Sequence, residues 1–418
     1  MNTLVITLLQ IIVIVICGRA VGLLLERIGQ PTVIGEIAAG ILLGPSAFGA
    51  LFPGAFARVF PAESLPTLVA LSQIGLILFM FLVGLEFAPQ LLRDKPHRVV
   101  VISHVSIIVP FILGTALAVY LHPRVSDPAV SFRSFTLFLG TAMSVTAFPV
   151  LARILQERRL LKTKIGNTVI ACAAVDDVTA WCILAFVVML ARAGHPQQFV
   201  IQLALLIAYV LAMLFGVRPL LRRLLPGSRL TETALAGVLV LVLVSATATE
   251  LLGIHALFGA FLVGAILPRE GPLIETLVAH IRGLTSVIFL PLFFAVTGLR
   301  TNIGLLTTPT LWLCGALVLA VAIVGKLGGA LFSAVTVGFS WREATAIGVL
   351  MNTRGLMEMV VLNIGRDIGV VSPSLFTMCV IMALVTTAMT TPLLRALWSP
   401  ALESPLAVEQ TPTLSVVE

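Results

Sequence analysis

Long apolar segments, separated by short polar loops, follow one another along the chain from residue 3 to residue 398. A helix of about 20 apolar residues crosses a hydrocarbon layer of ~30 Å, whereas the strands of a membrane barrel give short alternating segments. The pattern therefore predicts an all-α polytopic membrane protein with about 13 transmembrane helices, over residues 3–25, 32–52, 67–86, 99–121, 132–153, 165–191, 198–217, 231–250, 255–267, 283–299, 309–338, 343–365 and 373–398.

The amino-acid composition further restricts the class of protein. Of the 418 residues, 59% are hydrophobic and 11% are charged, against about 25% charged residues in soluble domains. A water-soluble enzyme is excluded, and we expect no enzymatic activity, no cofactor and no nucleic-acid partner. The five cysteines fall inside predicted spans without paired ligand spacing, so neither disulfides nor a zinc site are expected.

The loops between the spans differ in basic residues. One alternate set of loops holds 17 Lys and Arg residues and the other set holds 6. Cytoplasmic loops carry the excess of positive charge. The N-terminus is therefore predicted outside and the C-terminus in the cytoplasm of a cytoplasmic (inner) membrane, with residues 399–418 as a short cytoplasmic tail.

Three segments recur later in the chain. The matching positions are Gly40 with Gly264, Gly84 with Gly298, and Gly140 with Gly348. These pairs relate the second, third and fifth spans to the ninth, tenth and twelfth. A shift of seven spans is odd, so the two copies cross the membrane in opposite directions. This inverted repeat is typical of secondary transporters.

Two adjacent acids, Asp176 and Asp177, lie near the middle of the span 165–191. An intramembrane charge costs at least about 2.5–3.5 kcal/mol, and two neighbouring carboxylates would not both ionise in lipid. Side chains about 100° apart can face one polar cavity, where such a pair titrates as a unit and exchanges protons for a cation. A structural pair satisfied by hydrogen bonds is the alternative.

Lys326 lies near the middle of the span 309–338 and needs a counter-charge at the same depth. We expect an ion pair between Asp176 and Lys326 when no cation is bound. The alternative is a permanent salt bridge that only holds helices together.

Two spans carry signals of a broken helix. Pro149 follows Ser144 and Thr146 in the fifth span, and Asn352-Thr-Arg354-Gly355 stands at similar depth in the twelfth. Unwound backbone in a bilayer lines a cavity or is buried in protein, so freed carbonyls and the Thr146 hydroxyl could help to dehydrate a cation. An ordinary proline kink is the alternative.

Arg354 and Glu358 are four residues apart and can pair on one helix face. We interpret them as a structural or gating pair.

The chain resembles the monovalent cation:proton antiporter-2 family, which includes bacterial sodium/proton and Kef-type antiporters and the plant cation/proton exchangers. The resemblance is carried by QPTVIGEIAAGILLGPSAFG (30–49), GLILFMFLVGLEF (75–87), GTAMSVTAFPVLARIL (140–155), ACAAVDDVTAWCILA (171–185), LPLFFAVTGLR (290–300), VGKLGG (324–329) and NTRGLMEMVVLNIG (352–365).

The resemblance implies the sodium/proton antiporter fold with two crossed discontinuous helices. It implies a core domain (about 99–191 and 309–398), a scaffold that mediates homodimerisation (about 3–86 and 231–299) and a linker helix (about 198–217). By the same resemblance, Asp177 binds cation or proton, Asp176 pairs with Lys326, Ser144 and Thr146 stand at the unwound crossing, and the core moves like an elevator.

The sequence thus predicts an antiporter that exchanges Na⁺, or Li⁺, for H⁺, with Asp177 and Asp176 binding Na⁺ or protons in competition. An Asp-Asp pair accompanies sodium exchange in the family, whereas the sequence of the other motifs is similar to that of potassium exchangers. K⁺/H⁺ exchange is therefore the alternative. A channel is disfavoured because no repeated filter signature is present. An intramembrane aspartyl protease is disfavoured because such an enzyme needs two carboxylates from separate helices, whereas the two acids of this chain are adjacent on one.

Overall fold

A computed structural model describes residues 3–86, 96–158, 160, 163–192, 196–224, 232–268 and 272–397. Its helices are α1 (Thr3–Arg27), α2 (Thr32–Leu43), α3 (Phe48–Leu51), α4 (Pro53–Val59), α5 (Leu65–Glu86), α6 (Pro96–Val125), α7 (Phe132–Ser144), α8 (Phe148–Glu157), α9 (Lys164–Arg192), α10 (Pro196–Leu211), α11 (Arg218–Leu224), α12 (Glu232–Leu251), α13 (Ala256–Ile266), α14 (Pro272–Leu284), α15 (Leu290–Leu299), α16 (Pro309–Ile323), α17 (Gly329–Thr336), α18 (Trp341–Met351), α19 (Leu356–Asp367) and α20 (Pro373–Leu397). The predicted tail over 399–418 lies outside the described residues.

The all-helical membrane fold is confirmed, with one difference in the number of spans. Within the described ranges, 11 helical segments are long and apolar enough to cross a membrane, or up to 12 when the bent pair α18 and α19 is one span. The ninth predicted span, 255–267, is α13, an apolar helix of 11 residues. At 1.5 Å per residue it is about 16 Å long, too short to cross the hydrocarbon layer alone. The predicted loop 53–66 also contains a helix, α4.

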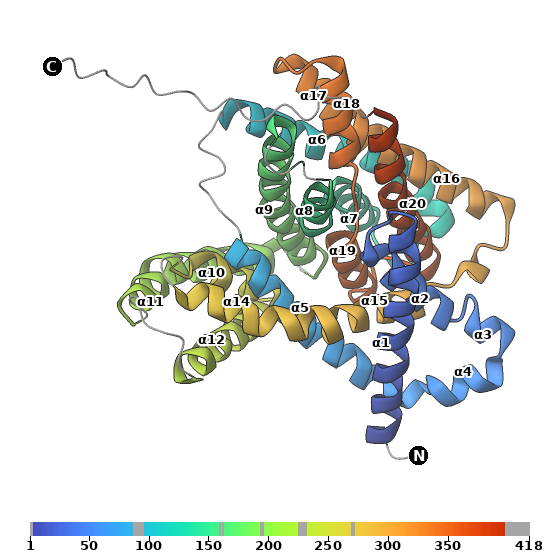
Figure 1. The fold of residues 1–418 in the computed structure, drawn as a ribbon, viewed down its shortest axis with the longest axis horizontal. Helices are drawn as coiled ribbons and strands as arrows, with labels where there is room; N and C mark the ends of the chain where they lie inside the picture. Colours follow the sequence, from blue (N-terminus) through green and yellow to red (C-terminus); the bar gives the residue numbers. More distant parts are fainter. Residues whose placement is uncertain are drawn as a thin grey trace.

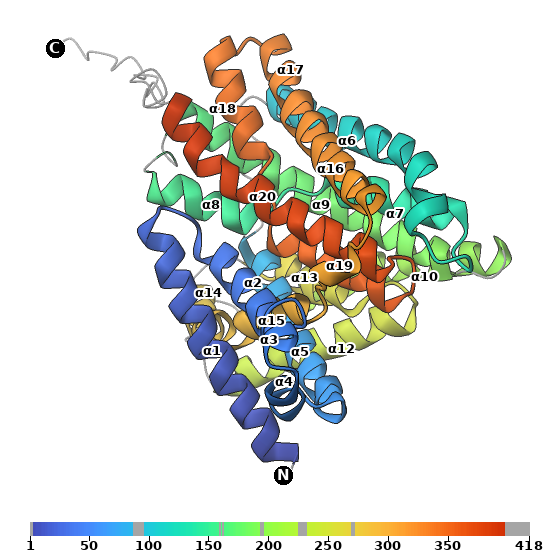
Figure 2. The same cartoon turned by 90° about the vertical axis from the view of Figure 1, so that its right-hand side faces the viewer.

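The helices pack in two groups. In the first, α2 packs against α1 and α15, and α5 against α13 and α15. In the second, α6 packs against α7, α9, α16 and α17, while α20 packs against α16, α18 and α19. Figure 2 shows α6, α9, α16 and α20 in the upper part of the molecule, and α1, α4, α5 and α12 in the lower part.

The glycines of the predicted repeat are points of close helix approach in the first group. A Cβ added to Gly298 on α15 would lie 2.2 Å from the carbonyl carbon of Gly40 on α2. A Cβ added to Gly84 on α5 would lie 3.0 Å from Cα of Gly264 on α13. Gly40 and Gly264 are repeat mates, as are Gly84 and Gly298. The two helix contacts are therefore two copies of one contact, in which small residues let backbones touch.

The two helix breaks meet inside the second group. α7 ends at Ser144 and α8 begins at Phe148, while α18 ends at Met351 and α19 begins at Leu356 with a bend of 42°. Figure 1 shows α7, α8 and α19 enclosed between α9 and α20. Pro149 lies in the first turn of α8, where a missing N–H costs nothing. The proline therefore starts a new half-helix rather than kinking a continuous one.

Candidate functional site

Asp176 on α9 is fully buried, with 0% of its surface exposed, and its two oxygens are surrounded by hydrogen-bond donors. Oδ1 accepts from Ser103 Oγ at 2.6 Å. Oδ2 accepts from Thr146 Oγ1 at 2.9 Å and from Lys326 Nζ at 2.8 Å, and lies 3.1 Å from Ser106 Oγ. An ionised carboxylate has about four acceptor positions. Asp176 therefore has four donors within hydrogen-bond distance, one at Oδ1 and three at Oδ2.

Lys326 reaches Asp176 from a π-helical segment, Val324–Gly328, between α16 and α17. Such local widening of a helix frequently marks functional sites. Gly325 allows the close packing, since a Cβ there would lie 2.8 Å from Cα of Pro110 on α6. The Lys326 ammonium also donates to the carbonyl oxygen of Ser144 at 2.6 Å. The expected ion pair is present, and both of its side chains are buried from solvent.

Asp177 has different surroundings although it is the next residue. Neither of its carboxylate oxygens has a hydrogen-bond partner of ordinary length, and both are buried. The side chain lines a small cavity of about 10 Å³ with residues of α5, α8 and α13, namely Val83, Phe148 and Phe261. That volume is near the lower limit for a single water molecule. Phe148 opens α8, so the carboxylate faces a helix N-terminus, which favours negative charge.

Arg354 stabilises the broken end of α7. Its guanidinium donates to the carbonyl oxygens of Ala142 at 2.8 Å and Met143 at 2.6 Å, and to Glu358 Oε2 at 2.7 Å. Helix C-terminal carbonyls lack partners in the chain and carry partial negative charge. With the lysine ammonium on the next carbonyl, two buried cations therefore occupy the end of this half-helix. The predicted pairing of Arg354 with Glu358 is present, and both side chains are 0% exposed.

The two hydroxyls predicted at the crossing have other partners than Asp177. The Ser144 hydroxyl lies 2.8 Å from the carbonyl oxygen of Gly140 and 3.1 Å from that of Ile107. Thr146 donates to Asp176, as described. Among the described residues, no side chain makes a hydrogen bond to Asp177, whose nearest donor is the backbone N–H of Phe148. The structure therefore brings Thr146 to the acidic pair through Asp176, and turns the Ser144 side chain back onto its own helix.

Sequence reasoning missed three hydroxyl residues of this site. Ser103 and Ser106 on α6 reach Asp176, and their spacing of three places them on one helix face. Thr387 on α20 accepts from the backbone N–H of Arg354 at 3.0 Å and donates to its carbonyl oxygen. The serines at positions i and i+3 in a mostly apolar span were a usable signal. No signal in the sequence pointed to Thr387. The backbone groups of Arg354 that it contacts lack helical partners only because α18 has ended there.

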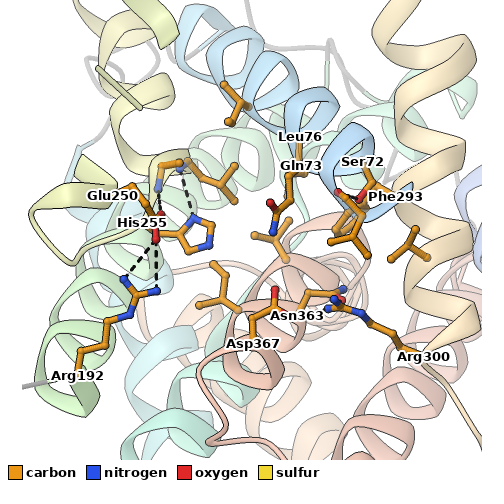
Figure 3. Close-up of a pocket in the computed structure, with 17 residues that line it drawn as sticks. Ser72, Gln73, Leu76, Arg192, Glu250, His255, Phe293, Arg300, Asn363 and Asp367 are labelled. Carbon is orange, nitrogen blue, oxygen red and sulfur yellow. Dashed lines mark hydrogen bonds and ion pairs between the residues drawn. The ribbon is translucent and has the colours of Figure 1, made fainter. Parts of the chain in front are cut away.

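A larger cavity of about 340 Å³ lies between the two helix groups (Figure 3). Two ion pairs at its rim join the groups to each other. Arg192 at the end of α9 lies 3.4 Å from Glu250 at the end of α12, and Arg300 after α15 lies 2.8 Å from Asp367 on α19. Asp177 does not line this cavity. This cavity and the Asp177 carboxylate therefore lie at different places between the two helix groups.

The profile of the family "Sodium/hydrogen exchanger, transmembrane" matches residues 11–398. The chain is 45% identical over 397 residues to the Na(+)/H(+) antiporter NhaS4 of Synechocystis sp., covering 94% of this chain and 97% of the relative. It is 40% identical over 402 residues to cation/H(+) antiporter 18 of Arabidopsis thaliana, covering 94% and 49%. To K(+)/H(+) antiporter 1 of Saccharomyces cerevisiae it is 36% identical over 376 residues, covering 87% and 43%.

Among solved structures, the sodium proton antiporter MjNhaP1 of Methanocaldococcus jannaschii has a TM-score of 0.67 at 15% identity, covering 96% of this chain and 98% of that chain. The shared fold is that of a membrane antiporter. The chain belongs to the sodium/hydrogen exchanger family of cation/proton antiporters. It spans nearly the full length of the Synechocystis relative and about half the length of the plant and yeast relatives.

Proposed function

We propose that this protein exchanges Na⁺, and also Li⁺, for H⁺, and that Asp177 is the group that binds either ion. The observation that carries the proposal is the contrast between two adjacent buried carboxylates. Asp176 is surrounded by side-chain donors, whereas neither oxygen of Asp177 has one. A buried, unpartnered carboxylate is costly unless it binds a proton or a cation.

Competition at one carboxylate couples the two ion fluxes. A proton on Asp177 removes the negative charge that would hold a cation, and a bound cation makes protonation unfavourable. Lys326 neutralises Asp176, so the site as a whole carries one charge to be balanced. Asp177 therefore carries the exchange, and Asp176 remains the fixed counter-charge of the lysine.

Alternating access requires one part of the protein to move past another. We propose that the second helix group, about 99–191 and 309–398, is a mobile core, that the helices of about 3–86 and 231–299 form the scaffold, and that 198–217 is the linker. The cavity and the two ion pairs between the groups support this division. Asp177 lies on α9 of the core and faces Val83 and Phe261 of the scaffold, so a shift of the core would change the route that reaches it.

K⁺/H⁺ exchange is the second candidate. The similarity to K(+)/H(+) antiporter 1 of yeast favours it, while the similarity to the Na(+)/H(+) antiporter NhaS4 favours sodium.

We also propose a homodimer in the cytoplasmic membrane that contributes to pH homeostasis, with the N-terminus outside and the C-terminus in the cytoplasm. The distribution of basic residues among the loops supports this orientation. Labelling of single cysteines placed at Arg124 and at Arg342 with a membrane-impermeant maleimide in intact cells tests it, since only the first is expected outside.

The central experiment measures proton movement in proteoliposomes with a pH-sensitive dye, after addition of Na⁺, Li⁺, K⁺ or Rb⁺. Wild-type protein is expected to respond to Na⁺ and Li⁺, and Asp177→Asn to neither. Asp127→Asn is the matched control, because Asp127 is an exposed carboxylate in the loop before α7. Full exchange by Asp177→Asn would contradict the proposal, and a response to K⁺ alone would establish the second candidate.

A further inference from the structure

Two arginines lie at the turn where α1 ends and α2 begins. Arg27 is the last residue of α1, and Arg395 lies in the last turn of α20. Gly29, the next residue but one after Arg27, has a left-handed backbone with a φ of 77°. A Cβ on Gly29 would lie 3.2 Å from Cζ of Arg395, so the guanidinium packs against bare glycine backbone. Figure 2 shows these ends of α1 and α20 on the same side of the molecule.

Hydrogen bonds fix this turn against α20. Gln30 Nε2 donates to the carbonyl oxygen of Ala388 on α20 at 3.1 Å. The backbone N–H of Gln30 donates to the carbonyl oxygen of Leu25 at 3.0 Å and closes the end of α1. Ala388 lies about two helical turns before Arg395. Arg395 therefore reaches the end of α1 from a helix that is already held in place there.

Neither arginine has an anionic partner within the described parts of the chain. Both side chains are exposed, and no hydrogen bond or ion pair joins either guanidinium to another described residue. Glu26, the nearest acid in the sequence, pairs with neither of them. Two positive groups at one turn repel each other, and a negatively charged ligand relieves that repulsion. A guanidinium binds phosphate through two parallel hydrogen bonds.

The surface next to Arg27 is apolar. Leu23 and Leu24 precede it by four and three residues, share its side of α1, and are each 60% exposed. α1 has 25 residues and is about 38 Å long, more than the ~30 Å of a hydrocarbon layer, so its end reaches the lipid headgroups. A phospholipid matches both features, because its phosphate meets the arginines and its hydrocarbon chains meet the leucines. Inorganic phosphate would use the arginines alone.

We propose that Arg27 and Arg395 together bind the phosphate of an anionic phospholipid, whose hydrocarbon chains cover Leu23 and Leu24. This site is distinct from Asp177 and holds no transported ion. Arg27 belongs to the helices proposed as scaffold and Arg395 to those proposed as core. A lipid bound at this turn therefore contacts both of the parts that the proposed exchange moves past each other.

The test is the melting temperature of the full chain in detergent during titration with phosphatidylglycerol, with phosphatidylcholine and inorganic phosphate as separate titrants. We expect only phosphatidylglycerol to raise the melting temperature of the wild-type protein. Each arginine near an anionic headgroup contributes about fivefold to binding. In Arg27→Gln/Arg395→Gln, the concentration that gives half of the rise should therefore increase about thirtyfold.

The matched control is Arg222→Gln/Arg223→Gln. It removes the same charge from two exposed arginines in the last turn of α11, and it is expected to leave the titration unchanged. If Arg27→Gln/Arg395→Gln does not fold, Arg27→Lys/Arg395→Lys keeps the charge without the planar fork and is expected to give a smaller loss.

Four results would overturn the proposal. The first is the same titration for wild type and Arg27→Gln/Arg395→Gln. The second is an equal loss in the control variant, which would show only a general attraction between lipid and a basic protein. The third is an equal rise with inorganic phosphate. The fourth is a changed oligomeric state with an unchanged lipid response, which would assign the arginines to a contact between two copies of the chain. Melting requires no ion exchange, so a failure of the proposed function is measured separately.

Discussion

The backbone N–H of Ala147 donates to the carbonyl oxygen of Thr353 at 3.1 Å. These residues lie more than 200 positions apart, in the unwound segments between α7 and α8 and between α18 and α19. The free N–H group in one unwound segment is thus satisfied by the free carbonyl oxygen in the other. Because a bilayer offers no water to such groups, the crossing holds both half-helix pairs in one place, directly beside the acidic pair.

Arg354 should be among the most important residues for the stability of this crossing. We expect Arg354→Gln to lower the free energy of unfolding by about 3–5 kcal/mol, because it leaves Glu358 as an unpaired buried charge and frees two carbonyls of α7. Thermal melting in detergent measures the loss. The double variant Arg354→Gln/Glu358→Gln is expected to melt higher than the single one, and an equal or lower melting temperature would argue against the ion pair.

The buried pair of Asp176 and Lys326 can be tested by a double-mutant cycle. We expect Asp176→Asn and Lys326→Met each to destabilise the protein by about 3–5 kcal/mol, since each leaves a buried charge without its partner. The double variant should lose less than the sum, with an interaction free energy of at least about 1 kcal/mol. Chemical or thermal unfolding of the four proteins gives that value, and strict additivity would contradict a direct interaction.

The repeated glycine contacts predict a steric effect of single methyl groups. A Cβ at Gly264 would lie 2.2 Å from the carbonyl oxygen of Phe81, a backbone atom that cannot turn away. We expect Gly264→Ala to cost about 1–3 kcal/mol through forced separation of α5 and α13. Gly283→Ala is the control, because a Cβ at Gly283 meets no atom within 4 Å. Equal melting temperatures of the two variants would refute the close approach.

Relative movement of the two helix groups can be tested where Arg300 and Asp367 meet. In a variant with the five native cysteines replaced, we introduce Arg300→Cys and Asp367→Cys and add a short cleavable bifunctional thiol reagent. We expect exchange in proteoliposomes to fall at least tenfold and to return after reduction, because the link prevents the core from moving past the scaffold. The two single-cysteine variants control for modification alone. Unchanged exchange after complete cross-linking would exclude movement at this position.

The sequence alone determined the class of fold and most of the charged chemistry. Apolar segments long enough to cross a bilayer are a local property, and so is the cost of a charge inside them. For this reason most of the spans, the two acids, Lys326 and the pair of Arg354 with Glu358 could be predicted. The glycine pattern revealed the repeat for a similar reason, because close helix packing selects small residues.

The pairing of Asp176 with Lys326 was expected from the sequence, but only the tertiary structure decided which other groups surround each of the two neighbouring acids. Asp176 and Asp177 have the same side chain and almost the same depth. Their difference arises because they project about 100° apart on α9, one toward the serines of α6 and the other toward the apolar faces of α5 and α13. The length of α13 and the partners of the α7 carbonyls were equally undetermined. Such contacts depend on helices distant in the sequence, and no local pattern specifies them.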